Sequence, residues 1–389
     1  MITELINEVR ETFIEQFEVE PILIFSPGRI NIIGEHTDYN DGFVFPAAID
    51  KGIVAGIYRS NSGSCKAIAL DLKSVFEFEL KKLSPCKEGS WKNYLLGVVA
   101  EIQYRKKLIG NFNIVLKSNV PKGAGMSSSA ALENSIVFGL NELFELKMSK
   151  EEMIFISQKA EHNYVGVKCG IMDQYASMFG IKDHALLLDC RTIKSKPYKI
   201  DFKNYQLLLI NTNVKHSLND SAYNDRRSAC EQVASLLKVK ALRDVTISDL
   251  KTIKSKVTPL NYQKALYVIQ ENQRTIKAVE AIENDDLETL GALIFQSHEG
   301  LSNQYKVSCE ELDFLVEEAK KNNHVIGARM MGGGFGGCTI NLIDNKEVEN
   351  FIKQVSVNYV NKFGLKCSIY PIALSEGVHI LNQSTSNQA

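Results

Sequence analysis

The spacing of apolar residues along the chain predicts a mixture of helices and strands. In the opening segment Leu5, Val9 and Phe13 recur every four residues, which is the spacing of an amphipathic helix with one buried face. An apolar run at 22–25 predicts a short buried strand, and the alternation at 111–120 predicts another strand that ends at a proline. A glycine-rich turn and then a helical pattern follow the second strand.

The remaining pattern extends this mixture to the end of the chain. Ser149 with Glu152 forms a capping box opening a helix expected to reach about Tyr164, and Ser308 with Glu311 forms a second box. Further strands are expected at 185–190, 205–212, TINLI and SIYPIAL. Two long helices are expected at about 260–300, and the terminal QSTSNQA is expected to be disordered. The pattern favours an α+β protein, and its length favours two domains, which we place at 1–180 and 181–389.

Composition and charge narrow the class of protein. Apolar residues make up 44% and charged residues 23%, and Lys+Arg at 45 nearly balance Asp+Glu at 46. A formal charge of −1 without a long basic run argues against nucleic-acid partners and against an anionic membrane surface. The first residues do not form a signal peptide, no apolar span could cross a bilayer, and the eight cysteines include no C-x-x-C pair. We expect a cytoplasmic protein with reduced thiols.

The stretch VPKGAGMSSSAALE at 120–133 has the features of a phosphate-binding loop. Its glycines allow successive amides to point at an anion, and its serines come where the helix begins and the positive end of the dipole lies. The expected nucleotide-binding residues are Gly123, Ala124, Gly125, Met126, Ser127, Ser128 and Ser129. An isolated cluster of this kind more often only turns the chain and caps a helix. A Walker motif and the protein-kinase motifs are both absent.

In this form the loop strongly resembles that of the GHMP kinases, which phosphorylate galactose, homoserine, mevalonate or phosphomevalonate. SPGRINIIGEHTDYNDGFVFPAAID at 26–50 is similar to the galactokinase signature over its whole length. The resemblance implies ATP and galactose as substrates. It also implies the two-domain GHMP fold, with an N-terminal domain like domain 2 of ribosomal protein S5, a ferredoxin-like α+β C-terminal domain, and the active site in the cleft between them.

The signature places Glu35, His36, Thr37 and Asp38 together on one glycine-flanked loop, where they could converge on a ligand. A hexose exposes hydroxyls that both donate and accept hydrogen bonds, and carboxylates together with an imidazole can recognise them through directional hydrogen bonds. The same residues could instead form an Asx-type turn, or a metal site using His36 and Asp38, although no second His/Asp cluster accompanies them. The resemblance adds Gly170 and Tyr223 to the sugar site.

The resemblance also implies the catalytic groups. CGIMDQYAS at 169–177 matches the galactokinase segment that carries the catalytic aspartate, here Asp173. A carboxylate there could accept the proton of the sugar hydroxyl, and Arg29 could hold it ionised and stabilise charge on the transferred phosphoryl group. Taken alone, an Asp in this context is more often a helix cap. Ser129 and Glu161 occupy the family's Mg²⁺ positions, although Glu161 could also be an exposed helical residue.

A third motif, GARMMGGGFGGCTINL at 327–342, fits a glycine-rich lid over the other two. Galactokinases usually have Thr where this chain has Met331, which puts a hydroxyl contact there in doubt. Trp91 matches a segment near the family's adenine pocket or is an ordinary core residue. We expect a monomer that makes α-D-galactose 1-phosphate from MgATP and α-D-galactose. The alternatives are a kinase for N-acetylgalactosamine or L-arabinose, and a non-catalytic galactose sensor, although sensors are damaged around the serine loop.

Overall fold

The computed structural model describes residues 2–87, 90–121, 123–215 and 219–381. Its first half is built on a six-stranded sheet with the strand order β13-β1-β3-β6-β4-β5, in which only β4 and β6 run parallel to each other. The strands are β1 (Ile22–Asn31), β3 (Pro46–Arg59), β4 (Cys65–Ala69), β5 (Ser74–Phe78), β6 (Phe112–Ser118) and β13 (His379–Ile380). The predicted strands at 22–25 and 111–120 are therefore confirmed, and the first of them is longer than expected.

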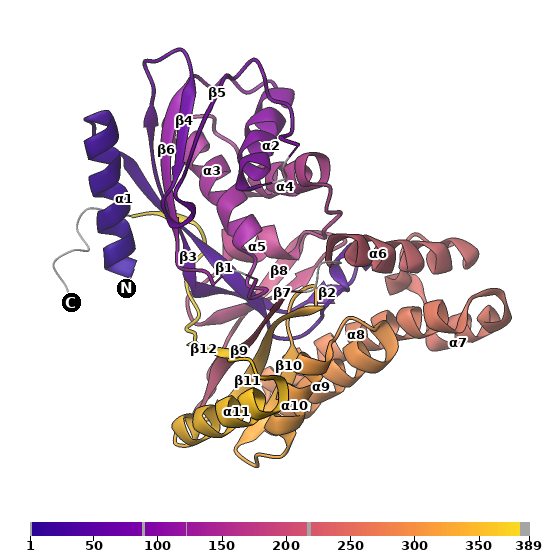
Figure 1. Cartoon of the computed structure of the whole chain (residues 1–389). Helices are drawn as coiled ribbons and strands as arrows, with labels where there is room; N and C mark the ends of the chain where they lie inside the picture. The colour runs from indigo at the N-terminus through magenta and orange to yellow at the C-terminus, as the bar shows by residue number, and fades with distance from the viewer. Residues whose placement is uncertain (1, 88–89, 122, 216–218, 382–389) are drawn as a thin grey trace.

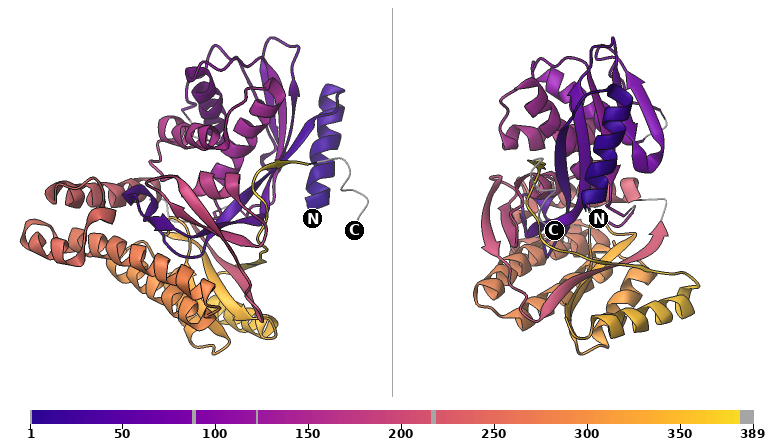
Figure 2. Two further views of the ribbon diagram at one scale, coloured as in Figure 1. Left: turned by 180° about the vertical axis from the view of Figure 1, so that it is seen from behind. Right: turned by 90° about the vertical axis from the view of Figure 1, so that its left-hand side faces the viewer.

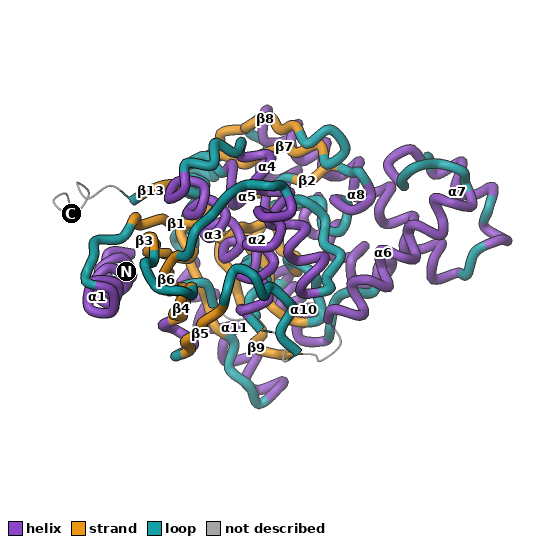
Figure 3. The backbone as a smooth tube through the Cα atoms, turned by 90° about the horizontal axis from the view of Figure 1, so that it is seen from above, coloured by secondary structure: helices purple, strands orange, loops and turns teal. Residues whose placement is uncertain are grey.

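Helices cover both faces of this sheet (Figure 3). Helix α1 (Ile2–Phe17) lies alone on one face and buries Leu5, Val9 and Phe13, which confirms the predicted amphipathic helix. The other face is covered by α2 (Trp91–Tyr104), α3 (Ser128–Phe144), α4 (Lys150–Ala160) and α5 (Met172–Phe179). Alternate strand residues face opposite cores, so that Leu23 packs with α1 while Ile24 packs with the helices of the other face.

One of the two predicted capping boxes forms. Ser149 and Glu152 cap α4 reciprocally as expected, and the chain then continues as a π-helical turn, η3 (Glu161–Val165), before Gly166 ends it. The second box was wrong. Helix α10 (Glu310–Lys320) begins one residue later than the box requires, with Cys309 as its N-cap, so Glu311 does not occupy the third helical position where a box needs it.

The second half contains a four-stranded sheet in the order β10-β11-β9-β12, with helices on both faces (Figure 1). Its strands are β9 (Tyr205–Lys215), β10 (Val325–Met330), β11 (Gly336–Asp344) and β12 (Ser368–Pro371). Helices α10 and α11 (Val348–Phe363) cover one face, and α8 (Pro259–Glu283) and α9 (Leu287–Glu299) pack on the other. The strands and long helices expected here are confirmed, although SIYPIAL forms a strand only over its first four residues.

Two further groups of elements complete the chain. Strands β2 (Phe43–Val44), β7 (His184–Asp189) and β8 (Lys194–Lys199) form a small sheet, which confirms the strand expected at 185–190. Helices α6 (Asn219–Leu236) and α7 (Ile247–Thr252) extend away from both large sheets beside α8 (Figure 1). None of the described helices is both long and apolar enough to span a membrane. The terminal QSTSNQA, predicted to be disordered, lies outside the described residues.

A shared hydrophobic core joins the two halves. It combines Ile32 and Phe45 from the segment after β1, Leu290 from α9, and Met126 and Met331 from the phosphate loop and the lid motif. The end of the chain also returns to the first sheet, where β13 pairs with β1 (Figure 2). The loops that the sequence singled out therefore meet where the halves join, and the predicted boundary near residue 180 stays a prediction.

Candidate active site

The loop between β6 and α3 has the backbone that a phosphate cradle requires. Gly123, Gly125 and Ser127 adopt left-handed conformations with φ of 71°, 70° and 56°. Ala124 and Met126, which alternate with them, bury their side chains in the shared core. The alternation anchors the loop on one side and leaves the glycines and serines on the other, at the N-terminus of a 17-residue helix whose dipole favours an anion.

Two cavities border this loop. One, of about 280 Å³, is lined by Ser128, Ser129 and Trp91, and the other, of about 240 Å³, by Gly123, Gly125 and the lid glycines. The Trp91 indole N–H donates to Ser74 Oγ at 3.3 Å while the ring packs on the edge of the first core. Trp91 is thus both a core residue and a wall of the cavity beside the serines.

Arg29 and Asp173 form a bidentate ion pair directly beside the phosphate loop. The guanidinium Nε and Nη2 donate to Oδ1 and Oδ2 of Asp173, both at 2.8 Å, and Nη1 donates to the carbonyl of Gly125 at 2.5 Å. The Ser127 hydroxyl donates to the same carboxylate. Burial opposes the charge of Arg29, but the carboxylates of Asp173 and Glu35 raise its pKa above the usual value.

The sugar stretch and the phosphate loop touch through their backbones. The amide of Arg29 donates to the carbonyl of Met126 at 3.1 Å. A Cβ on Gly28 would lie only 2.5 Å from that carbonyl oxygen, so a glycine is needed for this approach. The sugar stretch and the phosphate loop are therefore in direct contact.

A third cavity, of about 120 Å³, lies next to the ion pair and contains most of the predicted sugar-binding residues. Its lining includes Arg29, Glu35, His36, Asp38, Glu161, Gly170, Asp173 and Tyr223. Thr37 does not line it. The Thr37 hydroxyl lies 2.8 and 2.6 Å from the carbonyl oxygens of Gly34 and Phe43, so its side chain holds the loop together.

Asp38 and Gly170 fit one another. A Cβ on Gly170 would lie 1.9 Å from Asp38 Oδ2, so only glycine allows the carboxylate to take this position. The other oxygen, Oδ1, accepts the backbone N–H of Tyr39 at 2.9 Å. The Asx-type turn considered above would require the N–H of Asn40, which instead donates to the carbonyl of Thr37 at 3.0 Å. Burial, reinforced by the charge of Asp173, raises the pKa of Asp38 to about 7.

His36 lines the same cavity and is only 4% exposed, and its backbone has the left-handed φ of 61°. Its Nδ1 is 2.7 Å from the hydroxyl of Tyr39, while its Nε2 has no hydrogen-bond partner among the described residues. Burial and then the charge of Arg226 lower the pKa of His36 to about 3, so the ring is neutral. A buried polar atom without a partner is costly, so Nε2 is suited to a ligand.

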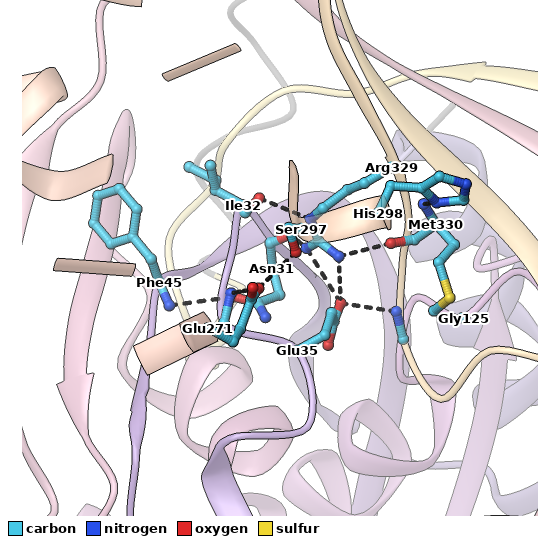
Figure 4. A network of polar contacts seen from close by, with 12 residues as sticks. Asn31, Ile32, Glu35, Phe45, Gly125, Glu271, Ser297, His298, Arg329 and Met330 are labelled. Atoms are coloured by element: carbon cyan, nitrogen blue, oxygen red, sulfur yellow. Dashed lines mark hydrogen bonds and ion pairs between the residues drawn. The ribbon is translucent and has the colours of Figure 1, made fainter. Parts of the chain in front are cut away.

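Glu35 is held by a residue that the sequence reading missed. Its Oε1 accepts from Nη1 and Nη2 of Arg329, each at 3.2 Å, and from the amide of Gly332 at 2.8 Å (Figure 4). Arg329 is completely buried and also donates to the carbonyls of Asn31, Ile32 and Met330. The only signal in the sequence is an arginine inside the strand-like run VIGARM of the lid motif.

A second buried carboxylate missed by the sequence reading supports the start of the sugar loop. Glu271 on α8 accepts the amide of Gly34 at 3.0 Å, the hydroxyl of Ser297 at 2.6 Å and Nε of Arg274 at 2.6 Å. Gly34 has φ of 101°, and a Cβ there would lie 2.9 Å from Thr275 Oγ1. Figure 4 shows the side chains of Glu35 and Glu271 within the same network of polar contacts.

Glu161 begins the π-helical turn η3 and is 7% exposed, so it is not the exposed helical residue of the alternative interpretation. Its Oε2 accepts from the side-chain amide of Gln174 at 3.0 Å, and the same amide donates to Oε2 of Glu133 at 3.2 Å. Oε1 of Glu133 has no hydrogen-bond partner among the described residues. Burial, and next the charge of Glu161, raise the pKa of Glu133 well above its usual value.

The glycine-rich motif packs its backbone against the phosphate loop. Cβ atoms on Gly125 and Gly332 would each lie 3.1 Å from a carbonyl oxygen of the other segment. Tyr223 from α6 completes the enclosure, with its ring centroid 5.4 Å from that of His36. Met331 is buried in the shared core, where its side chain packs against apolar groups.

Sequence profiles of known families match three parts of the chain. The galactokinase galactose-binding signature matches residues 11–59, the GHMP kinase N-terminal domain 93–181 and the GHMP kinase C-terminal domain 278–361. The galactokinase of Glaesserella parasuis is 41% identical over 92% of this chain and 94% of its own length. The galactokinase of Clostridium acetobutylicum is 39% identical over 97% and 100%.

Solved structures give the same result for the fold. The Lactococcus lactis galactokinase complexed with galactose superposes with a TM-score of 0.93 at 32% identity, covering 98% of this chain and all of that one. The Methanococcus jannaschii mevalonate kinase superposes with a TM-score of 0.66 at 18% identity, which is a likeness of fold alone. The predicted two-domain GHMP fold is thereby confirmed. With full-length relatives at about 40% identity and the galactose-binding signature in place, the chain belongs to the galactokinase family of the ATP-dependent GHMP kinases.

Proposed function

We propose that this chain transfers the γ-phosphate of ATP to the C1 hydroxyl of α-D-galactose, giving ADP and α-D-galactose 1-phosphate. The observation that carries the proposal is the position of Asp173. Its carboxylate is shared by Arg29 and Ser127, and it lies between the phosphate loop and the cavity that contains the sugar-binding residues. A sugar hydroxyl bound there would meet the carboxylate and a phosphoryl group held by the loop.

The phosphoryl transfer requires activation of the sugar hydroxyl and stabilisation of charge on the phosphoryl group. A sugar hydroxyl is a poor nucleophile, so Asp173 orients it and accepts its proton as the bond to phosphorus forms. Arg29 is bonded both to that carboxylate and to the carbonyl of Gly125, which places its positive charge beside the phosphate loop. The charge that develops on the transferred phosphoryl oxygens is stabilised there without any rearrangement of the site.

Sugar recognition follows from the mixture of groups around the 120 Å³ cavity. Glu35 and Asp38 present carboxylate oxygens, His36 presents an unpartnered ring nitrogen and Tyr223 presents an aromatic wall. Hexose hydroxyls offer donors and acceptors to such groups, and the apolar face of the sugar packs on the ring. Gly170 belongs to the site because it makes room for Asp38.

The residues present fit a Mg²⁺ ion carried in with ATP. The described residues contain no cluster of three or more potential metal-ligating side chains, and Mg²⁺ typically takes one or two protein oxygens with the rest from phosphates and water. We assign Ser129 and Glu161 as those ligands. The neighbouring Glu133 has one oxygen without a partner among the described residues, and its raised pKa favours the protonated, neutral form when no ion is bound. When bound between Ser129 and Glu161, the ion would neutralise negative charge on the phosphates.

Three further assignments complete the proposal. We infer that the domains divide at about residue 180, that the chain acts in the cytoplasm and that it is a monomer. All eight cysteines are free, which supports a reducing compartment. Light scattering coupled to size exclusion tests the monomer, and a dimer would contradict it.

Replacing Asp173 with Asn tests the central assignment. We expect kcat to fall by about 100-fold or more, because the amide cannot take up the proton, while galactose binding measured calorimetrically changes much less. Asp285→Asn is the control, because Asp285 is exposed in the turn between α8 and α9. Turnover of Asp173→Asn within tenfold of wild type would refute the role. Preferred turnover of another sugar in an ADP-release panel would refute the galactose assignment, and absence of turnover with every sugar would favour a sensor.

A further inference from the structure

A continuous series of polar contacts runs from the sugar cavity into the second half of the chain. His36 Nδ1 lies 2.7 Å from the Tyr39 hydroxyl, which lies 2.7 Å from the Tyr305 hydroxyl, which in turn lies 3.4 Å from Cys230 Sγ. Tyr305 is fully buried and Cys230 is 2% exposed. The series therefore leads inward from His36, whose other ring nitrogen, Nε2, has no hydrogen-bond partner among the described residues.

The acidities of the groups determine which group donates and which accepts in each of these hydrogen bonds. A phenol, with an ordinary pKa of about 10, is a far better proton donor than a neutral imidazole N–H, and the bare imidazole nitrogen is a better acceptor than a phenol oxygen. The Tyr39 hydroxyl therefore donates to Nδ1 of His36. The Tyr39 hydroxyl has a single hydrogen, which it donates to His36. In the contact between the two tyrosine hydroxyls, Tyr305 is therefore the donor and Tyr39 the acceptor. The proton of the neutral ring then resides on Nε2.

We propose that Tyr39 and Tyr305 are positioning residues that hold His36 as the neutral Nε2–H tautomer, so that the ring donates a hydrogen bond to a sugar hydroxyl oxygen. This rests on the proposed function, in which the cavity at His36 receives the sugar. Neither tyrosine lines that cavity. An ionised carboxylate can only accept hydrogen bonds, so the ring N–H of His36 adds a donor to the cavity.

The surroundings of Tyr305 show how its position is fixed. Tyr305 is the last residue of a π-helical turn, η6 (Gly300–Tyr305), a rare geometry that is frequent at functional sites. Its carbonyl accepts Nε of Arg226 at 3.1 Å, and its ring packs at 4.8 Å from that of Tyr267. Because Tyr267 also donates to the backbone carbonyl of Glu35 at 3.0 Å, the tyrosines and the sugar loop are fixed against one another.

The variants Tyr39→Phe and Tyr305→Phe remove one hydroxyl each and keep the ring. We expect Tyr39→Phe to raise the KM for galactose by about 3- to 10-fold, with a smaller rise in Tyr305→Phe, while the KM for ATP and kcat change little. Tyr359→Phe is the matched control. Tyr359 is equally buried and its hydroxyl donates to the carbonyl of Thr212 at 2.9 Å, in the core behind the second sheet. This control is expected to lose stability and leave both KM values unchanged.

The tautomer itself is read from the ¹⁵N shifts of histidine-labelled protein, with His36 assigned from the spectrum of a His36→Gln variant. Wild type is expected to show a protonated Nε2 and a bare Nδ1, and Tyr39→Phe a mixture of both tautomers. A protonated Nδ1 in wild type, or tyrosine variants that behave like Tyr359→Phe, would overturn the proposal. This readout needs no turnover, so failure of the kinase assignment and failure of the tautomer assignment are distinguishable.

Discussion

The buried pair between Glu35 and Arg329 is the feature whose loss should affect this protein most. Replacing Arg329 with Met removes the guanidinium and leaves the Glu35 carboxylate, only 2% exposed, with the amide of Gly332 as its remaining described partner. The carbonyls of Asn31, Ile32 and Met330 lose a donor at the same time. The variant therefore contains a buried charge with too few partners.

The expected cost follows from that geometry. Removing one partner of a buried ion pair costs about 3–5 kcal/mol, because the charge that remains has lost its compensation. Glu35→Gln removes the charge and keeps an acceptor, so it should cost less. In the double variant no charge remains buried, and the two effects should fall short of additivity by about 1–3 kcal/mol.

Urea unfolding at 25 °C provides the assay. Far-UV circular dichroism follows the whole chain, and the fluorescence of the single tryptophan, Trp91, follows the first half, so coincident transitions test whether one cooperative unit unfolds. Lys82→Met is the control, because Lys82 pairs with Glu79 at the exposed surface, where such a bridge contributes about 0–1 kcal/mol. A loss below about 1 kcal/mol in Arg329→Met, or strict additivity in the double variant, would refute the reasoning.

Two further changes test the sugar site, and a third tests the metal site. With a pKa of about 7, Asp38 gains a proton as the pH falls through 7, so the KM for galactose should rise there, and Asp38→Asn should abolish this pH dependence. Since that pKa lies above its value in the unfolded chain, Asp38 should also make the free protein less stable as the pH rises toward 7, which urea unfolding of both proteins at pH 5 and 8 checks. Gly170→Ala should raise the KM for galactose more than about tenfold by displacing Asp38, whereas Gly63→Ala, which has open space around it, should not. Glu161→Gln should raise the Mg²⁺ concentration needed for half-maximal activity, and an unchanged requirement would argue against it as a ligand.

The sequence was informative where structure is local. The burial of Leu5, Val9 and Phe13 and the capping box at Ser149 depend on neighbours within one or two helical turns, so periodicity was enough to predict them. The chemistry-bearing loops were visible for the same reason, because each is a short segment with glycines at its turns. The failed box at 308–311 differs only by a one-residue shift of the helix start, which tertiary contacts decide.

The residues that support the site could not be predicted in this way. Arg329 meets Glu35 across 294 positions of sequence and Glu271 meets Gly34 across 237, and both contacts depend on how the halves pack. A charged residue in a strand or helix pattern is ordinarily read as solvated, since burial of a lone charge is unfavourable. Only the three-dimensional structure shows that each charge has a partner.

The same core explains why a chain with Met at position 331 can keep the geometry of the site. Met331 and Met126 lie in one hydrophobic cluster, while the backbones beside them, at Gly332 and Gly125, approach to van der Waals contact. Packing of the two side chains below therefore fixes the distance between the lid and the phosphate loop above. Any residue at 331 that fills this volume meets the requirement, and a hydroxyl is not part of it. The spacing between the lid and the phosphate loop is thus set by apolar packing, which holds the backbone that carries the polar groups of the site.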